Sequence, residues 1–194
     1  MSRLAVGRIV LASASPRRAE LLRAAGIEFE VMPAHVDESA RVGESPHAYV
    51  SRVAEAKASA IAARADGRVV LAADTTVVVG GEMLGKPVDD ADAKRMLRLL
   101  AGRVHEVATG VTVSCGPSLT TRVDSTEVAF AALSEDEIAW YVATGEPRDK
   151  AGAYAIQGYA SRFITRIAGS YSNVVGLPIA LVYDLLKASG LTMP

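Results

Sequence analysis

Apolar and polar positions along the chain follow two alternating patterns. Short apolar runs typical of strands occupy residues 9–12, 29–32, 69–79, 83–84, 104–114, 121–131 and 161–167. Segments with helix start and stop signals or helical spacing occupy residues 16–25, 46–64, 89–100, 134–145 and 178–188. The alternation of helices with partly antiparallel strands predicts an α/β protein with a mixed sheet.

The first strand leads into a turn with two hydroxyl residues and two arginines. Ser13 and Ser15 precede Pro16, which suits the first position of a helix, and Arg17 and Arg18 follow. Ser15 is in position to cap this helix. The free N–H groups of a helix start and two guanidinium groups together favour a phosphate. The alternative is an ordinary helix start with surface arginines.

Asp74 interrupts the longest apolar run, at residues 69–79. A continuous apolar run is typical of a strand covered on both faces, where an ionised carboxylate needs a partner. Asp74 is therefore either paired with a lysine or arginine for structural reasons, or it is a metal ligand or general base. Thr75 places a hydroxyl beside it.

Lys57 falls within the apolar stripe of the helix at 46–64. Its apolar neighbours in that pattern are Val50, Val53, Ala54 and Ile61. Helical periodicity therefore points Lys57 inward or to the edge of the stripe. The alternatives are a lysine that snorkels to solvent and a lysine aimed at a phosphate.

Asp37 and Glu38 lie in the predicted loop at residues 33–43. Acidic loop residues are usually solvated, but a catalytic carboxylate pair would offer hard oxygen ligands to Mg²⁺ or Mn²⁺. The histidines lack zinc-ligand spacing and receive no metal role; they are His35, His47 and His105.

Two glycine-rich segments add candidate ligand contacts. Residues 80–87 read GGEMLGKP, but Pro87 replaces the Ser or Thr of a P-loop, and Gly80-Gly81 predicts a hairpin. Lys86 could still reach a phosphate. In residues 149–158, the amide of Gln157 offers both a donor and an acceptor to a base edge. A purely structural turn is the alternative there.

Composition narrows the class of protein. The chain has 194 residues, a formal net charge of −1 and one cysteine, Cys115. The near-zero charge argues against nucleic-acid binding. A single cysteine fits a reducing compartment, and neither a signal segment nor an apolar run of membrane-spanning length is recognised. We therefore expect a cytoplasmic protein that binds no membrane.

In order, these segments resemble the Maf family of nucleotide pyrophosphatases. The similar stretches are LASASPRRAELL, VDES, EAKA, ADTTVV, LGKP, GRVHEVATGV, EPRDKAGAYAIQG and GSYSNVVGLP. They span nearly the whole chain, so the resemblance implies one domain over residues 1–194. It also implies an elongated mixed, twisted sheet flanked by helices, with two lobes around a central cleft, and often a homodimer.

The resemblance implies hydrolysis of nucleoside triphosphates to the monophosphate and pyrophosphate, with a divalent cation (Mg²⁺ or Mn²⁺). Asp74 would be the proton acceptor and would touch the metal, which Glu38 would help to hold. The phosphate path would be lined by Ser13, Ser15, Arg17, Arg18, Lys57 and Lys86.

Three positions distinguish branches of the family. Arg17, Thr75 and Gln157 look like the branch that prefers dTTP and UTP. One alternative is the same reaction on 7-methyl-GTP or another modified purine nucleotide. The other is a non-catalytic, nucleotide-binding regulator of septum formation.

Overall fold

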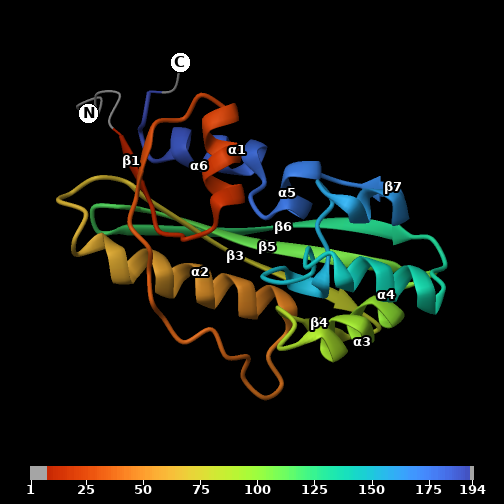
Figure 1. The fold of residues 1–194 in the computed structure, drawn as a ribbon. Coiled ribbons are helices and arrows are strands. Elements are labelled where there is room, and N and C mark those ends of the chain that lie inside the picture. The colour runs from red at the N-terminus through yellow and green to blue at the C-terminus, as the bar shows by residue number, and fades with distance from the viewer. Residues whose placement is uncertain (1–7, 193–194) are drawn as a thin grey trace. The chain divides into compact units, whose positions relative to one another are not determined.

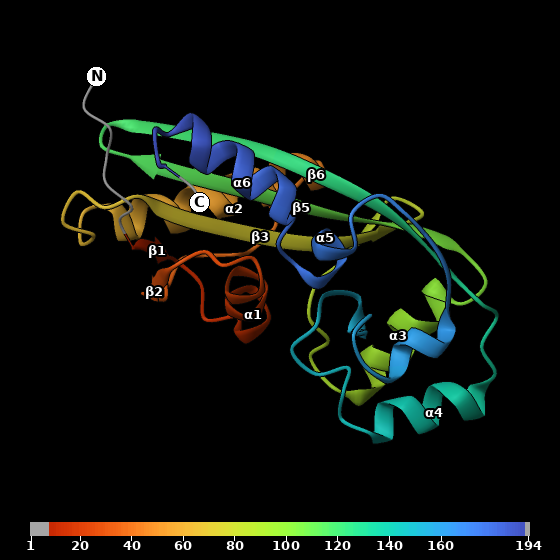
Figure 2. The ribbon, with the colours of Figure 1, turned by 90° about the horizontal axis from the view of Figure 1, so that it is seen from above.

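The computed structural model describes residues 8–192 and contains a seven-stranded mixed sheet (Figures 1 and 2). The strands are β1 (Ile9–Leu11), β2 (Phe29–Val31), β3 (Val70–Val79), β4 (Glu82–Leu84), β5 (Val104–Cys115), β6 (Ser118–Phe130) and β7 (Ile164–Ala168). Their order is β2-β1-β3-β5-β6-β7, with β4 on β3. β1 is parallel to β2 and β3, whereas β4 and β7 are antiparallel to their partners. The predicted mixed sheet is confirmed.

The α-helices are α1 (Pro16–Ala24), α2 (Pro46–Ala62), α3 (Asp90–Leu100), α4 (Glu135–Ala143), α5 (Tyr171–Val175) and α6 (Ile179–Ala188). Two short 3₁₀ segments follow α4, η1 (Ala151–Ala153) and η2 (Tyr159–Phe163). Among the described residues, no helix is long and apolar enough to cross a membrane.

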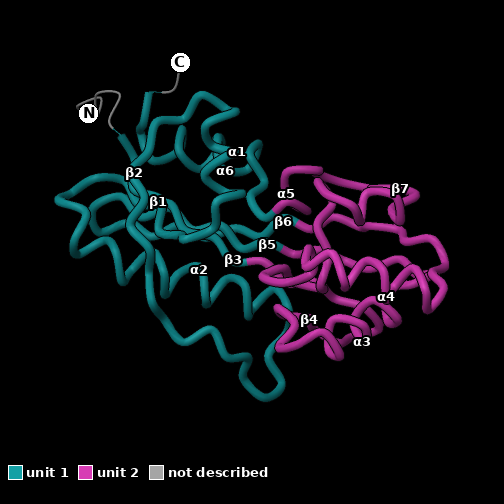
Figure 3. The backbone as a smooth tube through the Cα atoms, viewed as in Figure 1, with its two compact units in different colours: residues 1–74, 109–124, 176–194 teal, residues 75–108, 125–175 magenta. Residues whose placement is uncertain are grey.

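The chain divides into two compact units (Figure 3). The first comprises residues 1–74, 109–124 and 176–194, and the second comprises residues 75–108 and 125–175. β3, β5 and β6 each contribute residues to both units. The assignment of one domain to residues 1–194 stays a prediction.

Strand alternation builds the first unit. Side chains of a strand point to opposite faces in turn. Ile9 and Leu11 of β1 share one apolar cluster with buried residues of α1 and α6, whereas Val10 and Ala12 share another with Ala58 of α2. Figure 1 accordingly shows α1 and α6 on one side of these strands and α2 on the other.

Gly110 in β5 allows α2 to approach the sheet closely. A Cβ atom at this position would lie 2.6 Å from the carbonyl carbon of Val50 and 2.9 Å from the backbone nitrogen of Ser51. No side chain fits between strand and helix here. The glycine therefore sets how near the α2 backbone lies to the strands.

The second unit packs α3 against α4 and η1. α4 begins with a capping box, in which the Ser134 hydroxyl and the Glu137 carboxylate each bond the other residue's backbone N–H. His105, Phe130 and Tyr154 form a buried cluster of edge-to-face rings.

The structure corrects two predictions near the C-terminus. Residues 161–163, predicted as the start of a strand, belong to η2, and only residues from Ile164 onward form β7. The Ser161 N–H donates to the Gly158 carbonyl, three residues back, which closes a 3₁₀ turn. Residues 169–177 lie outside the predicted helices and strands, but they contain the short helix α5. The remaining predicted helices and strands are confirmed, and the majority of their ends lie within about two residues of the predicted ends.

Candidate active site

Strand parity brings Asp74 to the α2 side of β3. Val70 and Ala72 pack in the cluster that contains α2 residues, and Asp74 continues that alternation. The buried stripe of α2 includes Lys57, as its helical spacing predicts. The Lys57 Nζ atom lies 2.7 Å from Asp74 Oδ1, and only 7% and 5% of the two residues are exposed.

Asp74 is only half satisfied by this ion pair. Its Oδ2 atom is buried and has no hydrogen-bond partner within residues 8–192. Burial raises the pKa of the Asp74 carboxyl, although the charges of Lys57 and Arg18 oppose that shift. The structural partner expected for a buried aspartate is thus present, and one carboxylate oxygen remains for another ligand.

Glu38 contacts the same lysine from the loop before α2. Its Oε1 atom lies 2.9 Å from Lys57 Nζ, and its side chain is 47% exposed. Two carboxylates of very different burial therefore converge on one ammonium group. Of the two, the Glu38 carboxylate is the one that solvent reaches.

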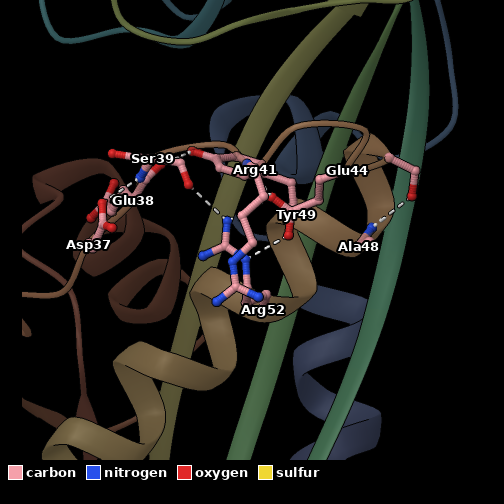
Figure 4. Close-up of polar contacts among 9 residues, drawn as sticks. Asp37, Glu38, Ser39, Arg41, Glu44, Ala48, Tyr49 and Arg52 are labelled. Atoms are coloured by element: carbon pink, nitrogen blue, oxygen red, sulfur yellow. Dashed lines mark hydrogen bonds and ion pairs between the residues drawn. The ribbon is translucent and has the colours of Figure 1, made fainter.

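A set of side-chain contacts fixes the loop that carries Glu38 (Figure 4). Arg52 on α2 donates to both carboxylate oxygens of Glu44, at 2.6 and 2.7 Å, and to the Ser39 carbonyl at 3.0 Å. The two bonds from Arg52 to Glu44 are the main cause that lowers the pKa of Glu44 to about 2. The Tyr49 hydroxyl donates to the Glu38 carbonyl at 3.0 Å, and burial raises the pKa of Tyr49 to about 12.

Asp37 forms a hydrogen bond within its own loop, whereas Glu38 contacts Lys57. It is exposed, and its Oδ1 atom accepts a hydrogen bond from the Ser39 N–H at 2.9 Å. That bond is the main cause of the lowered pKa of Asp37. Asp37 thus closes a local turn of the type common for aspartate, and Glu38 is the loop carboxylate that reaches Lys57.

The turn after β1 is organised around the Ser13 hydroxyl. Ser13 Oγ accepts from the Ser15 N–H at 3.2 Å and from Arg18 Nη1 at 3.1 Å. Arg18 Nε donates to the Gly176 carbonyl at 2.8 Å, and burial lowers the pKa of Arg18. Arg18 is therefore a buried anchor and not a surface arginine. The structure corrects the role of Ser15: it stands at the N-cap of α1, but its side chain makes no capping bond.

Of the remaining predicted site residues, Arg17 is partly buried in α1 of the first unit, and the others belong to the second unit. Thr75 is partly buried in β3, directly after Asp74. Lys86 is exposed after β4, and Gln157 is exposed in the turn between η1 and η2. The hairpin predicted at Gly80-Gly81 is confirmed, since Val79 pairs with Glu82 in an antiparallel ladder. The roles given to these residues stay predictions.

The donor set near Asp74 fits a hard divalent cation. Mg²⁺ is usually held by one or two carboxylates, with waters and substrate phosphates completing its shell. Asp74 Oδ2 and the exposed Glu38 carboxylate supply such oxygens. The described part of the chain contains no group of three or more His, Cys, Asp and Glu residues arranged to hold a metal. A cation here would rely on substrate oxygens as well as on the protein.

Sequence reasoning missed the residues that fix the loop. Tyr49 and Arg52 lie three residues apart on α2, a spacing that places side chains on one helix face. Glu44 directly precedes the Ser45 N-cap. The spacing was visible in the sequence, but the partners depend on how the loop folds back.

Comparisons with known proteins find similar chains over nearly the whole length. A family model described as Maf-like protein matches residues 8–189. A protein of Anaeromyxobacter dehalogenans (strain 2CP-C) named dTTP/UTP pyrophosphatase is 56% identical over 191 residues, which cover 96% of each chain. Proteins with the same name from Koribacter versatilis and Geobacter sulfurreducens are 52% and 53% identical; the matches cover 94% and 95% of this chain, and 94% and 97% of theirs.

Proposed function

The chain belongs to the Maf family, and from that premise we propose that it hydrolyses dTTP and UTP to the monophosphate and pyrophosphate. Relatives that are 52–56% identical to this chain over nearly their whole length are named dTTP/UTP pyrophosphatase. The observation that carries the proposal is the half-satisfied Asp74, buried against Lys57, whose Oδ2 has no partner in the part of the chain that the structure describes. A carboxylate in this state can take a proton or a ligand.

In the proposed reaction Asp74 accepts a proton from water. The water oxygen forms a bond to the α-phosphorus, the bond from that phosphorus to the α–β bridging oxygen breaks, and pyrophosphate leaves. Burial raises the pKa of Asp74, which makes its carboxylate a better proton acceptor, while Lys57 favours the ionised form that must accept. The two effects together suit a general base.

Several cationic and hydroxyl groups would line the phosphate path. Developing negative charge on phosphate oxygens is stabilised by fixed donors and cations. Arg18 is already held in place by Ser13 and Gly176, so that its guanidinium is oriented before a ligand binds. The complete set that we propose is Ser13, Ser15, Arg17, Arg18, Lys57 and Lys86.

Glu38 and Asp74 would hold the divalent cation, Mg²⁺ or Mn²⁺. A bound cation of this kind neutralises phosphate charge and helps the leaving group. Asp74 Oδ2, which has no partner among the described residues, and the solvent-facing carboxylate of Glu38 support this assignment. The loop contacts of Tyr49 and Arg52 would hold Glu38 in position for it.

We assign base preference to Arg17, Thr75 and Gln157. The Gln157 amide offers a donor and an acceptor, as a pyrimidine edge requires, and its exposed position in a turn leaves it accessible. The family resemblance also leads us to propose a homodimer, which sedimentation of the purified protein would test, and the single cysteine leads us to propose a cytoplasmic location.

The testing experiment is pyrophosphate release by the purified protein with Mg²⁺ or Mn²⁺. The substrates are dTTP, UTP, CTP, GTP, ATP and 7-methyl-GTP, and Asp74→Asn is the inactive control. Release from dTTP and UTP that is lost in the variant supports both reaction and preference. Preference for 7-methyl-GTP would support the proposed hydrolysis and reject the proposed preference for dTTP and UTP. No release from any nucleotide would favour a non-catalytic nucleotide binder.

A further inference from the structure

The turn that carries Gln157 is tied down on both sides by one pair of side chains in the second unit. On its C-terminal side, the Glu146 carboxylate accepts hydrogen bonds from the Tyr159 N–H at 2.8 Å and from the Ala160 N–H at 3.2 Å. On its N-terminal side, the Tyr141 hydroxyl accepts from the Ala155 N–H at 3.1 Å. Gln157 lies between these anchor points.

The two anchors are joined to each other. The Tyr141 hydroxyl donates to Glu146 Oε1 at 2.9 Å, so one hydroxyl both donates to the carboxylate and accepts from the turn. Tyr141 is fully buried in α4, and its ring packs edge-on against Phe163 with centroids 5.6 Å apart. The anchor therefore rests on a fixed side chain of the core.

Gly158 lets the turn approach the carboxylate. A Cβ atom at this position would collide with the Glu146 carboxylate oxygens, so no other residue fits without moving Glu146. The turn also closes on itself, because the Gly158 N–H donates to the Ala155 carbonyl at 3.1 Å. Gln157, by contrast, is exposed.

We propose that Glu146 and Tyr141 are positioning residues for base selection, acting through Gln157. This inference rests on the proposed function. An amide discriminates between bases only if its donor and acceptor are held in one orientation. A turn fixed before binding loses less conformational entropy when the nucleotide binds. Hydrogen bonds from N–H groups to a carboxylate are stronger than those to a neutral acceptor, which makes Glu146 an effective anchor.

The first test uses Glu146→Gln, which keeps the shape but replaces one accepting oxygen with an NH₂ group. We expect KM for dTTP and UTP to rise by about tenfold, the effect of losing one hydrogen bond to a charged group, with kcat largely retained. The preference for dTTP over CTP falls with it. Tyr141→Phe, which removes only the hydroxyl, changes KM and preference in the same direction. Glu135→Gln is the matched control, since Glu135 pairs with Arg98 on an exposed surface.

A double-mutant cycle asks whether Glu146 acts through Gln157. If it does, Glu146→Gln changes the base preference of the wild type but adds nothing in a Gln157→Ala background. Additive effects in the double variant would overturn the inference. So would equal loss of kcat with every nucleotide, which is the signature of a general structural defect.

Amide hydrogen exchange provides a readout that needs no activity. In Glu146→Gln, the Tyr159 and Ala160 amides should exchange faster, while those of β3 keep their protection. Unchanged protection at both amides would reject Glu146 as an anchor, whatever the substrate. An inactive wild type, in contrast, would reject the proposed function and with it the role in base selection, even if the exchange result held.

Discussion

Lys57 and Asp74 form a buried ion pair, 2.7 Å from Nζ to Oδ1, in which residues 8–192 satisfy only one carboxylate oxygen. A buried pair contributes little to stability unless hydrogen bonds satisfy the remaining atoms. Here Lys57 gains a second carboxylate, Glu38, while Asp74 Oδ2 has no hydrogen-bond partner among the described residues. This arrangement adds little stability as an ion pair, but it suits a carboxylate that takes a proton or binds a ligand.

Asp74→Asn should abolish hydrolysis while leaving the fold and nucleotide binding intact. The asparagine fills the same space and its oxygen can still accept from Lys57, but it cannot accept a proton from water. We expect kcat to fall by at least about 10²-fold, the usual contribution of a general base. Pyrophosphate release and nucleotide binding by calorimetry would be measured on the same preparation.

Asp66→Asn is the matched control, because Asp66 is exposed and its left-handed backbone (φ 51°) suits asparagine. It should behave like the wild type. Appreciable turnover by Asp74→Asn would show that another group accepts the proton.

Lys57→Met should move the pH dependence of activity. The Lys57 charge opposes the effect of burial on Asp74, so removing it raises the pKa of Asp74 further. Asp74 must be ionised to accept a proton, and the acidic limb of the kcat profile therefore shifts to higher pH. Lys187→Met, at an exposed position of α6, is the control. An unshifted acidic limb in Lys57→Met would separate Lys57 from the ionisation of Asp74.

Periodicity made much of this site predictable. The helical stripe of α2 predicted that Lys57 points inward or to the edge of the stripe, and the structure buries it; the apolar run around Asp74 predicted a buried strand, which is confirmed. Predicting that Lys57 and Asp74 contact each other also requires knowing which face of β3, and hence which of its alternating side chains, α2 covers. Sequence pattern supplies each periodicity, but it does not say which face of a strand a given helix covers.

Predictions failed where side chains had a choice of local partners. Ser15 had the position of a capping residue, yet the hydroxyl that organises this turn belongs to Ser13, because it also accepts from the buried Arg18. The anchoring of the Gln157 turn by Glu146 depends on contacts between residues 13 and 14 positions apart. No periodicity reports such contacts.

His105 should make the protein less stable as the pH falls from 7 to 5. Burial lowers the pKa of His105 to about 4, so the folded state holds it neutral, while the unfolded chain binds a proton near pH 6.5. The stability from this group is complete above pH 6.5 and is lost as the pH falls towards 4. By linkage, the free energy of unfolding drops by about 2 kcal/mol between pH 7.5 and pH 5.

Urea unfolding at several pH values would measure this slope, with His105→Phe as the comparison. Phenylalanine keeps the ring contacts with Phe130 and Tyr154 but cannot titrate. The Tyr154 hydroxyl loses its 2.8 Å hydrogen bond with the His105 ring, so the His105→Phe variant is less stable at pH 7. Its dependence on pH should nevertheless be flatter, and a slope equal to that of the wild type would assign the effect to other groups.

Arg52→Ala should weaken the use of the divalent cation by releasing the loop that carries Glu38. Arg52 joins α2 to Glu44 and Ser39 through three hydrogen bonds (Figure 4), and the variant leaves only the Tyr49 contact with the Glu38 carbonyl among these tethers. We expect the Mg²⁺ concentration for half-maximal activity to rise by about tenfold, the lower end of the cost of losing a partner that orients a metal ligand. Arg41→Ala is the control, since Arg41 contacts Glu44 through its backbone N–H. Limited proteolysis at residues 39–44 should accelerate in Arg52→Ala alone, and an unchanged Mg²⁺ requirement despite faster cleavage would remove Glu38 from the metal site.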